Sequence, residues 1–316
     1  MAVAAAAPSA SVSAPKLKET DYDGCLIGNN CQPLTKKLKP GERLTGQQIK
    51  DAWKSAYVSN SPCCQARRAA GKTLKRIVYV NGIRTDKAGQ CETLKRIANQ
   101  TCAQVLGVHN ATDGAMSDLW QSEQDRGLID RARAGKPFSA HDGRNPAVDS
   151  LSDVIANSVR DGDPPDIWAH SQGGAIASLA SYDADSRLKV SGYPQGISGL
   201  NVTSFASAAQ SWPSNISAEH FIQAQDEVPI QFGLGLDNSQ DAANTGPHQQ
   251  VVRFTGTPPN IYMPTPEEFS QKYQAAQLRR ATHAGWERSW TEYHDMNSIY
   301  LPAQRQKDGG CSPDGK

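Results

Sequence analysis

One stretch of the chain, Asp166 to Ala175, constrains the fold more than any other. Its first part, DIWA, is a short apolar run that predicts a buried strand. Small and apolar residues follow from Gly173 onward and predict a helix. Ser171 lies in the short junction, so the chain must turn sharply from strand to helix around it. Ala169 and Gly173, two positions before and after the serine, are as small as such a turn requires.

Strands and helices alternate along most of the chain. The other apolar runs that predict strands are RIVYV (76–80), AQVLGV (103–108), NVTSFAS (201–207), HFIQAQ (220–225) and QQVVRFTG (249–256). Helical patterns cover about 87–104, 115–134, 147–159 and 173–182. Thr265, Pro266 and Glu268 form a capping signal that starts a further helix. This alternation predicts an α/β fold, with a mainly parallel central sheet and helices on both faces.

The N-terminal part differs because it shows little hydrophobic periodicity. A helix is expected there only over 45–57, where Ile49, Trp53 and Tyr57 are spaced for one helix face. The opening segment, MAVAAAAPSASVSAPK, lacks the basic start of a signal peptide. We therefore expect a polar linker or appendage, partly disordered, over 1–70. The main α/β domain is expected over 71–305 and a tail over 306–316.

Charge and hydropathy exclude two classes of protein. The 33 Lys and Arg balance the 32 Asp and Glu, for a net charge of +1, whereas a nucleic-acid-binding protein normally carries a strong basic excess. No apolar run reaches the roughly 18 residues that a transmembrane helix needs. Any membrane contact is therefore expected to be peripheral, hydrophobic and local.

The chain has seven cysteines, at positions 25, 31, 63, 64, 91, 102 and 311. Their spacing fits no zinc pattern. Cys91 and Cys102 are predicted near one helix, about 16 Å apart, which is too far for them to bridge each other. A disulfide from Cys91 would therefore reach elsewhere, such as the N-terminal segment. Disulfides and reduced, buried thiols both remain open for these residues.

Ser171 needs a base to act as a nucleophile, and the base needs an orienting acid. In sheets with a serine on such a turn, the acid and then the histidine follow the serine along the chain. Four histidines follow here: His220 at a strand start, His248 in a loop before a strand, His283 inside a helix, and His294. His294 lies in a loop beyond the last strand, where the base is expected. His248 is the alternative.

Asp226 is predicted to be the acid. It directly follows the apolar run HFIQAQ, at the strand end where open α/β sheets bind ligands. Pro229 stops the strand from continuing. Glu227 and Asp237 are the alternatives for this role.

An oxyanion hole requires two backbone N–H groups near the nucleophile. One is expected from Gln172, directly after Ser171. The other is expected from Gly82 or Ile83, in the loop that follows the strand 76–80. Asn81 precedes them and is expected to hold this loop and to line the substrate site.

The segment after Asp226 carries the remaining candidates. Phe232, Leu234 and Leu236 alternate with glycine and could form an apolar wall or lid, or could simply pack on the core. Oxygen ligands over 237–241 could bind calcium, but the rest of a calcium loop is missing. His170, beside the nucleophile, is expected to be a packed neighbour. We predict no metal and no cofactor.

Four segments together resemble lipase-type α/β-hydrolases: YVNGI (79–83), AHSQGG (169–174), QDEVP (225–229) and Tyr293-His294. The D-x-V-P arrangement is similar to the acid loop of class 3 lipases. With the Asn-Gly loop, the combination resembles lipase-like toxin domains, such as type VI secretion lipase effectors. The resemblance covers about 74–302 and not the N-terminal part. Ala169 and Asn81 depart from the family's usual Gly and His without removing a catalytic atom.

The resemblance implies an α/β-hydrolase catalytic domain that cleaves carboxylic esters through Ser171, Asp226 and His294. It implies a lipase or phospholipase, acting as a secreted antibacterial or host-directed effector without a cleaved signal peptide, in the periplasm or at the membrane of a target cell. Secretion-apparatus and immunity proteins would then be partners. A soluble esterase, thioesterase or amidase is one alternative. A non-catalytic binding module is the other.

Overall fold

A mainly parallel central sheet organises the protein. The computed structural model describes residues 18–111, 128, 131, 145–234, 246–279 and 292–312. Within them an eight-stranded sheet has the order β1-β4-β3-β5-β6-β7-β8, and β2 pairs with β4 beside β1. The strands are β1 (Leu26–Ile27), β2 (Tyr57–Val58), β3 (Arg76–Val80), β4 (Gln104–Val108), β5 (Asp166–His170), β6 (Asn201–Phe205), β7 (Ser217–Gln223) and β8 (Gln249–Phe254). β3 to β8 run parallel, which confirms the expected α/β class.

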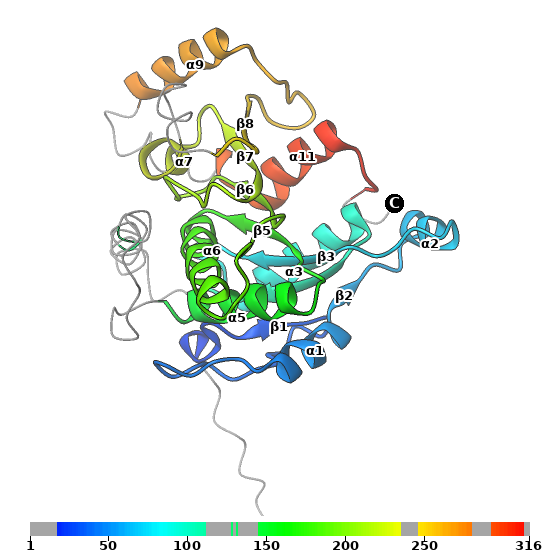
Figure 1. The fold of residues 1–316 in the computed structure, drawn as a ribbon. Coiled ribbons are helices and arrows are strands. Elements are labelled where there is room, and N and C mark those ends of the chain that lie inside the picture. The colour runs from blue at the N-terminus through cyan, green and yellow to red at the C-terminus, as the bar shows by residue number, and fades with distance from the viewer. Residues whose placement is uncertain are drawn as a thin grey trace, which may run out of the picture.

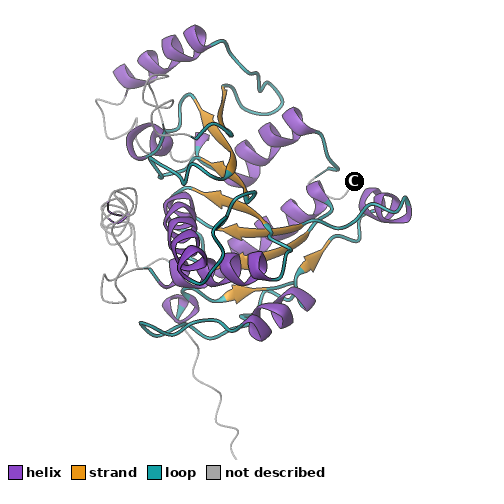
Figure 2. Cartoon of the chain, in the orientation of Figure 1, coloured by secondary structure: helices purple, strands orange, loops and turns teal. Residues whose placement is uncertain are grey.

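Helices cover both faces of this sheet (Figures 1 and 2). They are η1 (Glu19–Tyr22), α1 (Gly46–Lys54), α2 (Pro62–Ala69), α3 (Lys87–Thr101), α5 (Pro146–Arg160), α6 (Gln172–Val190), α7 (Glu227–Phe232), α9 (Pro266–Arg279), the π-helix η2 (Met296–Tyr300) and α11 (Leu301–Asp308). The helix expected over 115–134 lies almost wholly outside the described residues.

Strand β3 shows how the two faces are built. Val78 and Val80 belong to one buried cluster, which also contains the apolar residues of α1, α5 and α6. Ile77 and Tyr79 belong to a second cluster with residues of α3, η2 and α11. Because side chains alternate along a strand, a continuous apolar run supplies both layers of the core.

Residues 18–70 pack onto this body, although an appendage was expected over 1–70, and residues 1–17 lie outside the described residues. β1 and β2 both pair antiparallel with β4. Ile49 and Trp53 of α1 are buried in the same cluster as α5. The two strands contain two residues each, which is too short for a periodic pattern to reveal them. The described residues of the expected tail, 306–312, are also docked, since α11 reaches Asp308 and Cys311 is buried.

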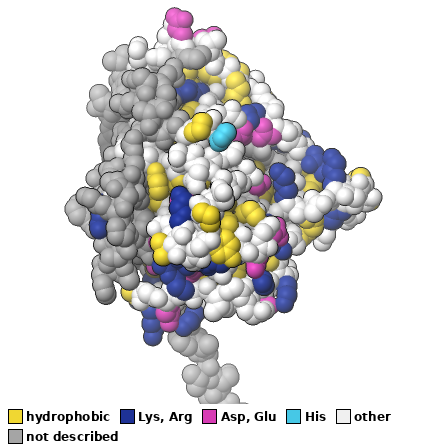
Figure 3. Space-filling model, in the orientation of Figure 1, with side chains coloured by type: hydrophobic (Ala, Val, Ile, Leu, Met, Phe, Trp, Pro, Cys, Tyr) yellow, Lys and Arg dark blue, Asp and Glu magenta, His cyan; other side chains and the backbone are white. Residues whose placement is uncertain are grey.

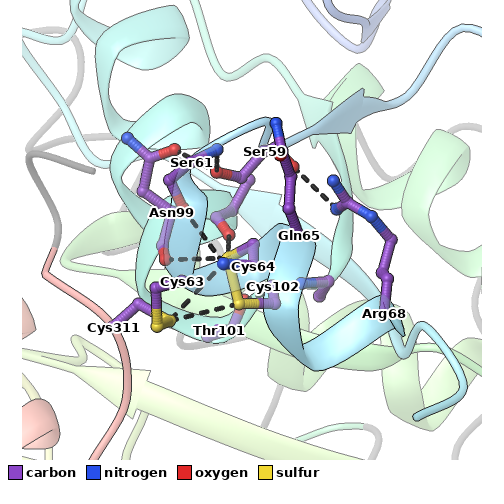
Figure 4. Close-up of a disulfide and its surroundings, with 12 residues drawn as sticks. Ser59, Ser61, Cys63, Cys64, Gln65, Arg68, Asn99, Thr101, Cys102 and Cys311 are labelled. Carbon is purple, nitrogen blue, oxygen red and sulfur yellow. Dashed lines mark hydrogen bonds between the residues drawn. A yellow bond between two sulfur atoms is a disulfide. The ribbon is translucent and has the colours of Figure 1, made fainter. Parts of the chain in front are cut away.

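Three disulfides join sequence-distant parts of the chain. Cys31–Cys91 ties the N-terminal region to α3, as expected for a bridge that leaves Cys91 for another element. Cys63–Cys311 and Cys64–Cys102 lie together between α2, the end of α3 and the C-terminal segment (Figure 4). Cys25 is free and buried, and this burial raises the pKa of its thiol to about 12.

The surface shows no large field of one charge on the face drawn in Figure 3, where basic, acidic and apolar side chains are interspersed. Among the described residues, no helix has the length and apolar character needed to cross a membrane.

Candidate active site

Ser171 lies at the junction of β5 and α6 with a strained backbone. Its φ of 59° and ψ of −126° fall in a region that residues with a side chain rarely adopt. Three backbone hydrogen bonds hold this turn: the Ser171 N–H donates to the Phe205 carbonyl at 2.9 Å, and the Ser171 carbonyl accepts the Gly174 N–H at 2.9 Å and the Ala208 N–H at 3.0 Å. Strain of this kind persists only where the surrounding structure fixes it, and it is typical of functional sites.

Two glycines allow α6 to start directly behind the serine. A Cβ on Gly173 would lie 2.5 Å from the Val80 carbonyl oxygen, and one on Gly174 would lie 2.1 Å from Ser207 Oγ. Both distances are far below van der Waals contact, so neither position accepts a larger residue. Ala169, on the strand side of the turn, is fully buried and fits with its methyl group. The small residues in the sequence therefore serve the close approach of α6 to β3 and to the loop after β6.

The structure brings Ser171, His294 and Asp226 together. His294 Nε2 lies 2.9 Å from Ser171 Oγ. His294 Nδ1 lies 2.9 Å from both carboxylate oxygens of Asp226. All three side chains are buried. The hydrogen bonds predicted for these residues are both present.

The hydrogen-bond partners of His294 assign the positions of its ring protons. An ionised carboxylate can only accept, so His294 Nδ1–H donates to Asp226. The other ring nitrogen of a neutral imidazole is then an acceptor, and it faces the Ser171 hydroxyl. This arrangement lets the histidine receive the serine proton.

The alternatives to these residues lie elsewhere. His248 is exposed just before β8, and His220 is buried on β7, where its Nδ1 lies 2.8 Å from Ser204 Oγ. Glu227 follows Asp226 as the first residue of α7. His283 and Asp237 lie outside the described residues.

Asp226 is held by two further donors. It caps α7, and its Oδ1 accepts the Val228 N–H at 3.0 Å. Its Oδ2 accepts the Tyr300 hydroxyl at 2.6 Å. Burial and the neighbouring Asp226 raise the pKa of Tyr300 well above its ordinary value, so this hydroxyl remains a donor. Nothing local in the sequence marks Tyr300, because its role depends on η2 placing it against the end of β7.

His170 also contacts His294. Its Nε2–H donates to the His294 carbonyl at 2.8 Å, and the two ring centroids lie 4.7 Å apart. Burial and the neighbouring His294 lower the pKa of His170 to about 3. His170 is therefore neutral near pH 7 and adds no positive charge beside His294. The expectation of a packed neighbour is confirmed.

The loop after β3 approaches Ser171 closely at Gly82. A Cβ on Gly82 would lie 2.5 Å from Ser171 Cβ and 3.0 Å from Ser171 Oγ, so only glycine fits. Ile83 follows and is buried. Gln172, on the other side, is the first residue of α6, where backbone N–H groups point out of the helix. Both predicted oxyanion segments thus flank Ser171.

Asn81 fixes this loop and is not a substrate-facing side chain, which corrects one expectation. It is fully buried, its Nδ2 donates to the Asn110 carbonyl at 2.8 Å and the Gly82 carbonyl at 3.0 Å, and its Oδ1 accepts the Asn110 N–H at 2.9 Å. Asn110 Nδ2 in turn donates to Gln172 Oε1 at 2.8 Å. Asn110 therefore links the two oxyanion segments. It follows a predicted strand, but no sequence pattern identified it.

Of the two alternatives for Phe232 and Leu234, an apolar wall or packing on the core, the structure shows packing on the core. Leu234 is buried in the main core cluster, and the half-buried Phe232 packs against that cluster. These two side chains therefore stabilise the body instead of offering an open acyl-binding surface. Leu236 and the calcium alternative at 237–241 lie outside the described residues.

Comparison with known families and curated proteins identifies no relative of this chain. No family model matches the chain, and no curated protein matches it. The assignment of a function therefore depends on the residues and distances of the site itself.

Proposed function

We propose that this chain is a serine ester hydrolase with an α/β-hydrolase fold. The observation that carries the proposal is the continuous hydrogen-bonded series of Asp226, His294 and the strained Ser171. The chain order of serine, acid and histidine, and the loop after β3 beside the nucleophile, match the arrangement in that fold. A nucleophile–base contact with an orienting third group is also the general signature of covalent catalysis.

The reaction follows from the positions of these groups. Ser171 Oγ attacks the ester carbonyl while His294 Nε2 takes its proton, and Asp226 stabilises the resulting imidazolium. The backbone N–H of Gln172 and that of Gly82 or Ile83 stabilise the oxyanion. His294 then protonates the departing alcohol and leaves an acyl group on Ser171. Water, activated by the same histidine, releases the acid.

For the substrate we propose a long-chain acyl ester, most directly a phospholipid, and for the setting an effector delivered to a target cell. The segments that resemble type VI lipase effectors support this, with secretion-apparatus and immunity proteins as the partners. Three disulfides suit an oxidising destination such as the periplasm. A soluble esterase is the second candidate, because Leu234 packs in the core and so contributes no exposed acyl-binding surface.

A paired substrate assay tests this proposal. We expect the wild type to release fatty acid from phosphatidylcholine or phosphatidylethanolamine vesicles, and Ser171→Ala to release none above background. Ser178→Ala is the matched control, since Ser178 is a buried serine of α6 that donates to the Ser211 carbonyl away from the triad. Turnover of short p-nitrophenyl esters without any fatty acid release would favour the soluble esterase. No turnover of esters of any chain length would favour a binding module.

A further inference from the structure

Two of the disulfides form one compact group of sulfurs, the four-cysteine cluster of Cys63, Cys64, Cys102 and Cys311 (Figure 4). Cys311 Sγ is bonded to Cys63, yet it lies only 3.4 Å from Cys102 Sγ and 3.9 Å from Cys64 Sγ. A thiolate at the Cys311 position would therefore lie beside the neighbouring disulfide, and a rotation of its side chain would bring it into line with the Cys102–Cys64 bond for attack. Disulfides exchange when a thiolate attacks one of their sulfur atoms.

Cys63 is the most exposed residue of the cluster. Cys64, Cys102 and Cys311 are 0%, 6% and 3% exposed, whereas Cys63 is only partly buried against them. An external thiol would therefore meet the Cys63 sulfur first. Its attack there would release Cys311 as the thiolate.

The backbone keeps Cys311 in reach after that bond opens. The Cys311 N–H donates to the Gln100 carbonyl at 3.0 Å, so its position does not depend on the disulfide alone. Cys102 is the C-terminal cap of α3, with its N–H bonded to the Ala98 carbonyl at 2.8 Å. Backbone hydrogen bonds around the end of α3 thus keep both residues close together, and the Cys311 side chain is free to turn toward Cys102 once its bond to Cys63 opens.

Cys64 is suited to be the leaving group. It lies in the first turn of α2, whose N-terminal cap is Ser61, and a helix N-terminus stabilises a thiolate. After protonation, its thiol has a carbonyl acceptor at 3.3 Å, that of Asn99. Both features favour a state in which Cys64 is free and Cys102 is bonded to Cys311.

We propose that the four-cysteine cluster is a thiol–disulfide exchange site that is entered at Cys63. A dithiol, such as that of a disulfide oxidoreductase, reduces Cys63–Cys311 and is itself oxidised to a disulfide, so two electrons and two protons pass to the protein. The Cys311 thiolate then attacks Cys102 Sγ, a Cys102–Cys311 bond forms, and Cys64 leaves as a thiolate that takes up a proton. This second step consumes no further reductant.

The exchange has a directional result. The C-terminal segment remains tethered through Cys102–Cys311, whereas α2 loses both of its disulfides and carries two adjacent thiols, the half-buried Cys63 and the buried Cys64. The partner contact is therefore expected at the start of α2. This inference does not depend on the proposed ester hydrolysis.

The Cys63→Ser variant tests the exchange step, with Cys31→Ser as the matched control. Both remove a half-buried cysteine whose partner is buried, but Cys91 has none of the cluster sulfurs beside it. After acid quenching and alkylation, peptide mapping of Cys63→Ser should find Cys102 linked to Cys311 and, apart from the free Cys25 that every variant carries, most of the label on Cys64. Label confined to Cys311, with Cys64–Cys102 intact, would overturn the proposal. In Cys31→Ser the label should stay on Cys91.

A titration of the wild type with limiting dithiothreitol gives a second test that needs no variant. The first species lacking one cluster disulfide should carry Cys102–Cys311 and alkylated Cys63 and Cys64. A first species with alkylated Cys63 and Cys311 and an unchanged Cys64–Cys102 bond would contradict the exchange.

Discussion

The sequence determines two regions of the protein in different ways. One is the edge of the sheet that carries the triad of Ser171, Asp226 and His294, and the other is the flank that disulfides hold together. At the triad edge, Ser171 and Asp226 each follow a strand and cap a helix, so adjacent residues determine their positions, whereas His294 comes from a loop 123 positions from Ser171 and 68 from Asp226. At the flank, formed by residues 18–70 and the four-cysteine cluster, the bonds join residues 60, 248 and 38 positions apart. The difference teaches that local geometry supports the chemistry, whereas long-range bonds support the body that carries it. Substitutions at the triad edge should therefore change the rate of ester hydrolysis, whereas substitutions at the flank should change the free energy of unfolding.

The largest effect is expected from His294→Ala. Because the triad acts as a unit, kcat/KM for a soluble ester should fall by about 10⁴-fold or more. His248→Ala is the control, since this exposed histidine lies outside the triad, and it should retain wild-type activity. If kcat/KM falls equally in the two variants, and circular dichroism shows that both proteins are folded, His294 is not the base.

Gly82→Ala should have the next largest effect. The added methyl group would meet Ser171 Cβ at 2.5 Å and displace the loop that is proposed to stabilise the oxyanion. Loss of one such donor costs about 10²- to 10³-fold in kcat. Gly46→Ala on the flank is the control, because its nearest neighbour would be an Asn157 side-chain oxygen at 3.3 Å. Similar rates for the two variants would show that the loop plays no catalytic part.

Tyr300→Phe is expected to have a smaller effect. The lost hydrogen bond to a carboxylate is worth about 1.5–3 kcal/mol, so we expect kcat to fall by about tenfold to a hundredfold with little change in KM. The remaining charge on Asp226 is less stabilised, so it attracts the His294 proton more strongly. The acidic limb of the kcat/KM profile should therefore move to higher pH.

Tyr79→Phe separates this positioning role from the general cost of losing a buried hydroxyl. Tyr79 is equally buried, but its hydroxyl interacts with Thr93 and not with the triad. Its pH profile should match the wild type. If both variants shift the profile alike, Tyr300 has no specific role through Asp226.

The Cys31→Ser variant should leave the chemistry almost unchanged. Removing the disulfide relaxes a long loop in the unfolded state and should lower the free energy of unfolding by about 2–4 kcal/mol. Urea unfolding measures this loss, and kcat under native conditions should stay within error of the wild type. A large fall in kcat without a loss of stability would show that the flank and the triad are not separable.

The same contrast explains what the sequence could predict. The turn at Ser171 could be predicted because the strand, the serine and the small residues that the turn requires all lie within ten residues, Asp166 to Ala175. Asp226 and His294 were found from their places after strands. Tyr300 and Asn110 were missed, since each acquires its role only when a distant segment packs against it. For Leu234 the sequence left a substrate wall and core packing open, because a glycine-rich stretch does not show which leucines reach the core.

The strands of the N-terminal region could not be predicted, for a related reason. Two strands of two residues carry no periodic signal, and their stability comes from pairing with β4. The disulfide pattern was equally hidden, because six paired cysteines allow about 15 connectivities and sequence alone does not choose among them.

The most direct test of the central claim is labelling with a fluorophosphonate, followed by peptide mapping. The account predicts one adduct on Ser171 in the wild type, none in Ser171→Ala, and wild-type labelling in the Ser178→Ala control. A slow reaction in His294→Ala would show that the histidine activates this serine. An adduct at another residue, or an unlabelled wild type with an accessible probe, would contradict the claim that Ser171 is the nucleophile.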